Sequence, residues 1–212
     1  GTRAPTALEL TCADPEAPCK LPNNFLADPP LEQVVAKTVE IGARGRASPA
    51  LQWSAALYRT ELDNDIQFIS SGGAALNTGY FANVGQTRRQ GLELGAIVHT
   101  EWMELAVHYS LIDATYQTAF VEHSPSNSSA DANGDIVVQP GDRIAGIPRQ
   151  SAKLRVDFRI TPQWDLAFSA VYNSGVYARG DENNQDVNGK VPGYTVVNFD
   201  TRWRITNALE LF

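Results

Sequence analysis

The sequence predicts an all-β fold in which long antiparallel strands form the wall of a transmembrane β-barrel. Three observations predict it: apolar and polar residues alternate along most of the chain, short turns alternate with long polar connections, and the tryptophans gather near the short turns. Because successive side chains of a strand point to opposite faces, this pattern gives each strand one apolar and one polar face.

The alternation recurs in seven segments, and an eighth begins at Ala208. In residues 152–160 every second residue is apolar and every residue between them is charged. The other segments are residues 39–44, 51–58, 92–99, 103–111, 164–173 and 197–205. Residues 50–69 and 79–100 form runs of about twenty residues, whereas a membrane crossing needs only ~9–11 tilted residues. We therefore expect the strands to extend beyond the bilayer at the long-loop end.

The connections alternate in length along the chain. Short links fall at residues 47–50, 99–102, 161–163 and 206–207, and long ones at residues 70–78, 124–148 and 179–192. We expect residues 1–33 to form another extracellular loop and residues 34–212 to form the barrel segment. Short turns at one end and long loops at the other are typical of a bacterial outer-membrane barrel.

The four tryptophans each lie within about three residues of a short link. They are Trp53, Trp102, Trp164 and Trp203. Tryptophan favours the interface between membrane and water, because its ring is apolar while its N–H needs a polar partner. This placement predicts an aromatic belt at one level of the wall; the alternative is that all four are ordinary core tryptophans.

The polar face carries many charged residues, among them Arg155, Arg159, Arg202 and Arg204. Such residues can face water on a half-exposed antiparallel sheet. The strand lengths and the tryptophan positions favour the polar lumen of a barrel instead. We therefore expect these four arginines to face the lumen, toward a ligand or a plug.

Composition and cysteine use narrow the choice further. The net charge of -7 and the pI near 4.9 argue against a nucleic-acid partner. No run approaches the ~18 apolar residues of a membrane-spanning helix. Cys12 and Cys19 lie in a stretch rich in proline and aspartate. A small loop disulfide, and hence an oxidising compartment, fits this better than two free thiols.

The sequence contains no complete motif for catalysis or metal binding. The chain has no Gly-x-Ser-x-Gly elbow, phosphate loop or His-Glu-x-x-His pair, so we expect neither an enzyme nor a bound cofactor. Residues 131–142 resemble a calcium loop, but Ile136 stands where such a loop needs glycine. An acidic, mobile extracellular loop is the better interpretation, as it is for residues 181–186.

One family resemblance follows from a set of short motifs. Residues 83–95, Asn-Val-Gly-Gln-Thr-Arg-Arg-Gln-Gly-Leu-Glu-Leu-Gly, resemble a segment of TonB-dependent outer-membrane receptors. In that family Asn-x-Gly, basic residues and then Gly-x-Glu open a strand in the C-terminal part of the barrel. Residues 31–42, 143–148 and 191–199 resemble other segments of the family in the same order. The resemblance covers roughly residues 31–212.

The resemblance implies a barrel of about 22 strands, of which this chain supplies about seven or eight, with the lumen plugged by a separate N-terminal domain. It implies outer-membrane import of a scarce nutrient, such as a ferric siderophore, haem, cobalamin or an oligosaccharide, energised by the TonB complex through the plug. Arg88 and Arg89, near the long-loop end of their strand, are then candidates for binding an anionic ligand. No plug-like segment or TonB-contacting box is visible, and closing strands are expected beyond Phe212.

Two alternatives stay open at this point. A passive porin would share the wall but lack the plug. A soluble β-sandwich adhesin or carbohydrate-binding module would share the alternation, but it would bury the apolar face against a second layer of protein.

Overall fold

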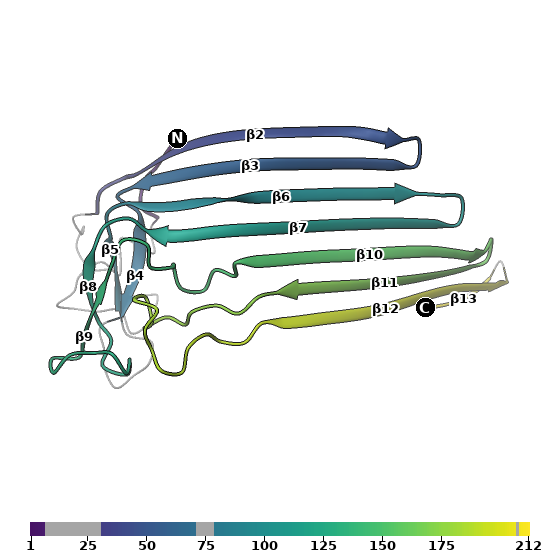
Figure 1. Ribbon diagram of the computed structural model, residues 1–212. Helices are drawn as coiled ribbons and strands as arrows, with labels where there is room; N and C mark the ends of the chain where they lie inside the picture. The colour runs from purple at the N-terminus through teal and green to yellow at the C-terminus, as the bar shows by residue number, and fades with distance from the viewer. Residues whose placement is uncertain (7–30, 71–78, 207) are drawn as a thin grey trace.

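The computed structural model describes residues 1–6, 31–70, 79–206 and 208–212. These residues form thirteen strands in three antiparallel sheets (Figure 1). None of them belongs to a helix long and apolar enough to cross a membrane. The strands are β1 Thr2–Arg3, β2 Val34–Ser48, β3 Leu51–Asp63, β4 Ile66–Ser70, β5 Gly79–Asn83, β6 Thr87–His99, β7 Met103–Tyr116, β8 Phe120–His123, β9 Asp135–Val138, β10 Gln150–Thr161, β11 Trp164–Asn173, β12 Tyr194–Thr206 and β13 Leu209–Leu211.

The main sheet holds nine strands in the order β1-β2-β3-β6-β7-β10-β11-β12-β13. Seven of them are long, and they correspond to the seven alternating segments of the sequence. The links β2–β3, β6–β7 and β10–β11 are short and lie at one end, the turn end, while the long connections lie at the other, the loop end (Figure 1). The predicted antiparallel connectivity is confirmed. Thr2 and Arg3, expected in a loop, pair with the start of β2.

The strand register keeps apolar residues opposite apolar residues, which joins them into continuous rows. One row crosses five strands through Val98, Leu105, Val156, Phe168 and Phe199. A row on the opposite face passes through Ser54, Gly95, His108 and Lys153. Because a shift of one residue would move every side chain to the other face, this register fixes an apolar face and a polar face for the whole sheet.

The apolar face is open along its length. Val39 and Ile41 on β2 are 76% and 73% exposed, and Phe199 on β12 is 66% exposed. The two small sheets, β4–β5 and β8–β9, lie at the loop end rather than over this face (Figure 1). Among the described elements nothing forms the second layer that a β-sandwich requires.

A compact hydrophobic cluster is found at the loop end instead. Tyr116, Val138 and Ala114 are almost completely buried in it, and the Tyr116 and Phe120 rings meet edge to face with centroids 5.1 Å apart. The other buried members are Ile69, Val84 and Ile144. The long connections are therefore packed together by side chains from β4, β7, β9 and the segments between them.

Two runs expected as continuous strands of about twenty residues are each broken near the loop end. β3 stops at Asp63 and β4 begins at Ile66, with Asn64 at a φ of 56° between them; β5 and β6 are separated at Gly85, whose φ is 80°. Asparagine and glycine adopt this left-handed conformation more readily than other residues. At Gly85 a Cβ would also come within 2.8 Å of Thr118. The β4–β5 hairpin consequently turns away from the main sheet.

Candidate functional site: the polar face, the charged collar and the loop end

The arginines predicted to face the lumen lie on the polar face, where two of them form ion pairs with carboxylates and the other two lie opposite acidic residues in the strand register. Arg155 donates from Nε to Asp157 at 2.8 Å, and Arg202 donates from Nη2 to Glu210 at 3.1 Å. Arg159 lies opposite Asp165 and Arg204 opposite Glu210 in the strand register. The turn end of the polar face thus carries positively and negatively charged side chains next to each other. A contact of these arginines with a ligand or a plug stays a prediction.

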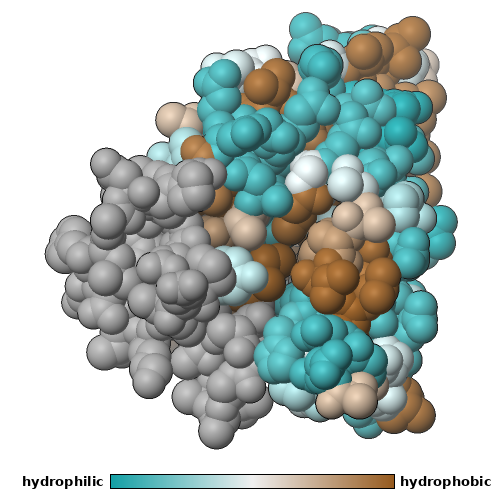
Figure 2. Space-filling model, turned by 90° about the vertical axis from the view of Figure 1, so that its left-hand side faces the viewer, coloured by the Kyte–Doolittle hydropathy of each residue, from teal (hydrophilic) through white to brown (hydrophobic). Residues whose placement is uncertain are grey.

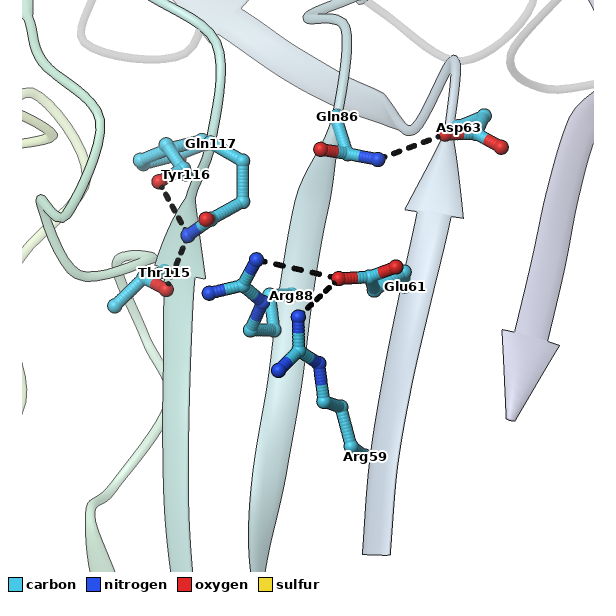
Figure 3. Close-up of polar contacts among 8 residues, drawn as sticks. All are labelled: Arg59, Glu61, Asp63, Gln86, Arg88, Thr115, Tyr116 and Gln117. Atoms are coloured by element: carbon cyan, nitrogen blue, oxygen red, sulfur yellow. Dashed lines mark hydrogen bonds and ion pairs between the residues drawn. The ribbon is translucent and has the colours of Figure 1, made fainter. Parts of the chain in front are cut away.

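Arg88 and Arg89 lie on opposite faces, because neighbours along a strand point in opposite directions. Arg89 is on the polar face: Nη2 donates to Asp65 and Nη1 to Thr87 Oγ1, each at 3.1 Å. Asp65 is buried and also accepts from Thr87 Oγ1 at 2.7 Å. Arg88 shares the apolar face with Leu92 and contacts Glu61 at 3.2 Å (Figure 3). Arg88 and Arg89 therefore lie on different faces of the sheet, and binding of an anionic ligand by either arginine stays a prediction.

Arg88 is part of a band of charged residues that follows the apolar rows on the same face toward the loop end. Its ion pairs join Lys37 to Asp63 at 2.8 Å, Arg59 to Glu61 at 2.6 Å and Arg143 to Asp113 at 3.3 Å. We call this band the charged collar; it consists of Lys37, Arg59, Glu61, Asp63, Arg88, Asp113 and Arg143. The hydrogen bond from Arg59 holds the pKa of Glu61 below its ordinary value, and Arg88 adds to the effect.

All four tryptophans lie at the turn end. Trp164 and Trp203 are cross-strand partners with ring centroids 6.4 Å apart, and Trp102 stacks on Phe158 at 6.1 Å. Trp53 lies opposite Ala96 in the apolar rows. Trp164 Nε1 donates to Thr201 Oγ1 at 3.0 Å, which satisfies its polar atom. All four are at least 38% exposed, so they are not core residues of the described chain. The belt itself stays a prediction.

Sequence reasoning missed two tyrosines nearer the loop end of the same face. Tyr109 on β7 and Tyr172 on β11 both pair with Ala152 of β10, one on each side. They share a face with Leu154 and Val156, so the apolar rows have aromatic residues toward both ends. The alternation of residues placed both tyrosines on the apolar face correctly. The sequence around a tyrosine in the middle of a strand does not indicate how far from the turn end it lies.

The loop end is closed by contacts between two connections that are far apart in sequence. Ser124 Oγ and Asn127 Nδ2 both donate to the carbonyl oxygen of Gly180 at 2.8 Å. Asn184 exchanges two hydrogen bonds with the backbone of Arg143, at 2.6 and 3.0 Å. Viewed from this end, hydrophilic residues cover most of the coloured surface, and hydrophobic residues show in smaller patches (Figure 2).

Residues 181–186, expected as a mobile acidic loop, are packed in this interface. Asp181, Glu182 and Asn183 are 4%, 5% and 4% exposed. A local contact contributes to this packing: the carboxylate of Asp181 accepts from the amide of Asp186 at 2.9 Å, so this side chain organises the turn rather than facing water. Burial raises the pKa of the Glu182 carboxyl. Burial also raises the pKa of Tyr116, and the carboxylates of Glu182 and Glu122 add to that shift.

The candidate calcium loop is a turn of the same kind. Asp131 Oδ1 accepts from the amides of Asn133 and Asp135 at 2.8 and 3.0 Å. No group of three His, Cys, Asp or Glu side chains suited to a metal ion occurs among the residues that the structure describes. Two histidines each lie beside a carboxylate, His99 with Glu104 at 3.0 Å and His123 with Asp135 at 2.8 Å. Cys12 and Cys19 lie outside the described residues.

The open apolar face, the charged polar face, the turns at one end and the packed loops at the other define the wall of a transmembrane-type antiparallel β-barrel. The chain belongs to the TonB-dependent receptor-like β-barrel family, whose family model matches residues 1–212. This confirms the resemblance seen in the short motifs. The family consists of transport receptors with outer-membrane barrels, which bind small-molecule ligands and act with a plug and TonB.

Known relatives agree with this membership. A probable TonB-dependent siderophore receptor, PiuA of Acinetobacter baumannii, is 27% identical over 192 residues, which are 89% of this chain and 23% of that protein. The crystal structure of the siderophore receptor PiuA from the same organism superposes with a TM-score of 0.59 at 24% identity, over 89% of this chain and 24% of that one. The copper transporter OprC superposes with a TM-score of 0.64 at 17% identity, over 99% and 28%. The chain thus spans about a quarter of the length of these relatives.

Proposed function

We propose that this chain is part of the barrel of an outer-membrane receptor that imports a ferric siderophore and is energised by TonB. The observation that carries the proposal is the family match over residues 1–212, combined with a relative named as a siderophore receptor. OprC is named as a copper transporter, so barrels with this fold serve more than one cargo. The alternatives of a passive porin and a soluble adhesin have no comparable support.

In this proposal residues 34–212 contribute wall, lumen and extracellular loops, and the connection between β1 and β2 contributes a further extracellular loop closed by a Cys12–Cys19 disulfide. The partners are outer-membrane lipid on the apolar face, the plug and a small-molecule nutrient in the lumen, and the TonB complex through the plug. The lumenal candidates for the ligand or the plug are Arg89, Arg155, Arg159, Arg202 and Arg204. Arg89 is the member nearest the loop end, where a ligand arrives.

The test is uptake of radioactive iron by cells that produce the full receptor. Cells lacking their other siderophore receptors would be given ⁵⁵Fe-labelled catecholate and hydroxamate siderophores, with and without a functional TonB. The proposal predicts saturable uptake of one siderophore that disappears when TonB is inactivated. Uptake that continues unchanged without TonB would indicate a passive porin, and TonB-dependent uptake of copper or cobalamin but of no siderophore would move the substrate to another class.

A further inference from the structure

The negative charge of this chain is concentrated in the long connections at the loop end. These connections are residues 4–33, 64–86, 117–149 and 174–193, and each joins two neighbouring strands of the main sheet (Figure 1). They contain thirteen of the 24 acidic residues but only five of the 17 basic residues. The rest of the chain has slightly more basic than acidic residues. The connections therefore account for the net charge of -7.

Several acidic side chains of these connections hydrogen-bond to neutral backbone amides. Asp142 accepts from the Gln139 amide at 2.7 Å, and Asp186 accepts from the Ser128 amide at 3.0 Å. Asp131 accepts from two amides of its own turn. Backbone hydrogen bonds hold the pKa of Asp131 and the pKa of Asp186 below the ordinary aspartate value, so both are ionised at neutral pH. A neutral donor satisfies a carboxylate without cancelling its charge.

A buried carboxylate adds to this excess of negative charge. Asp181 is 4% exposed, and its Oδ2 atom is buried without a hydrogen-bond partner. Its charge acts on its neighbours: burial raises the pKa of Asp142 and the pKa of Glu182, and the carboxylate of Asp181 adds to both shifts. A carboxyl group becomes harder to ionise where negative charge is near it. The described part of the loop end therefore has a negative local potential.

Four cations at this end are engaged by groups of the chain itself. Arg89 contacts the buried Asp65 at 3.1 Å, and Arg143 contacts Asp113 at 3.3 Å. Two further cations lie over aromatic rings: Arg179 is 5.4 Å from the centre of the Phe68 ring, and Lys190 is 4.8 Å from that of Tyr177. An anionic ligand would have to compete with these contacts for a cation, whereas a neutral or cationic ligand would leave them in place.

We propose that the loop end selects against anionic cargo, so that the ferric siderophore imported by this receptor is neutral or positively charged. The inference rests on the proposed function and names the chemical class of its substrate. A negative potential at an entrance concentrates cationic ligands, speeds their association and repels anions. Three singly ionised hydroxamate groups neutralise Fe³⁺, whereas three doubly ionised catecholate groups leave the ferric complex anionic. The substrate is therefore a ferric hydroxamate rather than a ferric tris-catecholate.

The experiment measures the association rates of ferric complexes with the purified full receptor in an uncharged detergent. Three probes share one linear trihydroxamate whose terminal amine is free, acetylated or succinylated, so the ferric complex is cationic, neutral or anionic on the same scaffold. A ferric tris-catecholate is the fourth probe. The association rate should fall from the cationic to the anionic derivative, and the tris-catecholate should bind most weakly. The differences between the three derivatives should shrink as the ionic strength rises, because salt screens the potential.

Charges added at one exposed position of the loop end test the source of the selectivity. Ala132→Glu should raise the ratio of the association rates of the cationic and anionic derivatives about twofold, and Ala132→Lys should lower it about twofold. Opposite effects at one position cannot come from damage to the fold. Gln163→Glu and Gln163→Lys, exposed in the β10–β11 turn at the other end, are the matched controls and should leave the ratio unchanged.

Two results would overturn this inference and leave the proposed function intact: stronger binding of the tris-catecholate than of the trihydroxamates, or equal association of the three derivatives at low ionic strength. Equal effects at Ala132 and Gln163 would place the selectivity outside the loop end and would also overturn it. TonB-dependent uptake is measured separately in cells. If no ferric siderophore is taken up there, the proposed function fails and this inference fails with it.

Discussion

The strand region and the loop end of this chain are determined by different features of the sequence. In the strand region most residues follow one binary choice, apolar face or polar face, and the register repeats that choice across seven strands. At the loop end, Tyr116, Glu122 and Glu182 are buried together with hydrogen-bonded turns. A wall that meets lipid needs only a periodic pattern. A packed assembly of loops needs specific contacts between distant segments.

The largest expected effect tests the packing of the loop end. Tyr116 is 2% exposed and lies at the centre of the hydrophobic cluster. Replacing a buried aromatic residue with alanine costs about 3–5 kcal/mol. Tyr116→Ala should therefore open residues 117–147 locally while the seven long strands stay folded. Hydrogen exchange of the full receptor in detergent should show lost protection at β8 and β9 and unchanged protection at β10 and β11; loss throughout the main sheet would mean that the two regions are one cooperative unit.

The second effect tests the strand region. Val156 on β10 is the middle residue of the apolar row that crosses five strands, and it lies between Leu105 and Phe168. An arginine on a lipid-facing position at mid-bilayer costs about 2–4 kcal/mol. Val156→Arg should lower the free energy of unfolding from lipid vesicles by this amount. Ser110→Arg, on the polar face opposite Glu93, is the matched control and should cost less than 1 kcal/mol. Similar costs at the two positions would contradict the assignment of the faces.

The alternation of residues was enough to predict the strand region. It separated Leu154 from Arg155 and Phe199 from Asp200 correctly, since a period of two is a local property of the chain. The same rule, applied strictly, would have placed Arg88 with Leu92 and Arg89 with Gly91. Because the two adjacent arginines were treated as one motif, their placement on opposite faces was not predicted.

The loop end could not be predicted in the same way. Nothing near Asp181 in the sequence indicates that Asn127, more than fifty residues earlier, donates to Gly180 and covers that turn. Acidic, asparagine-rich segments usually indicate solvated loops, and here their carboxylates cap backbone amides instead. Asparagine and glycine at positions 64 and 85 are residue types that favour a break in a strand. Because apolar and polar residues alternate on both sides of each position, the sequence predicted continuous strands there.

The third effect compares the two neighbouring arginines directly. Arg89 neutralises Asp65, whose side chain is only 6% exposed, whereas Arg88 shares Glu61, at 31% exposure, with Arg59. Arg89→Gln leaves a buried carboxylate without its cation and should cost about 1–3 kcal/mol, even though Thr87 still donates to it. Arg88→Gln should cost less than about 1 kcal/mol. Thermal unfolding of the two variants in the same detergent measures the difference, and equal losses would show that the faces do not differ in burial.

The smallest effect concerns the pH dependence of the loop end. Burial raises the pKa of Glu182 in the folded protein. Its contribution to stability is therefore fully present below the ordinary glutamate pKa of about 4.3 and is lost as pH rises through the raised value. Glu182→Gln imitates the protonated form and can still accept from the Gly180 amide. It should therefore increase the hydrogen-exchange protection of residues 178–188 at neutral pH and leave it unchanged below pH ~4.

Asp186→Asn should instead decrease this protection at neutral pH. Hydrogen bonds from Ser128 and Asn188 lower the pKa of Asp186, and such a group stabilises the fold only above its ordinary pKa. Protection factors, corrected for the intrinsic exchange rate and measured against pH, distinguish the gain expected for Glu182→Gln from the loss expected for Asp186→Asn. The same pH dependence of protection in both variants would exclude Glu182 as a buried acid.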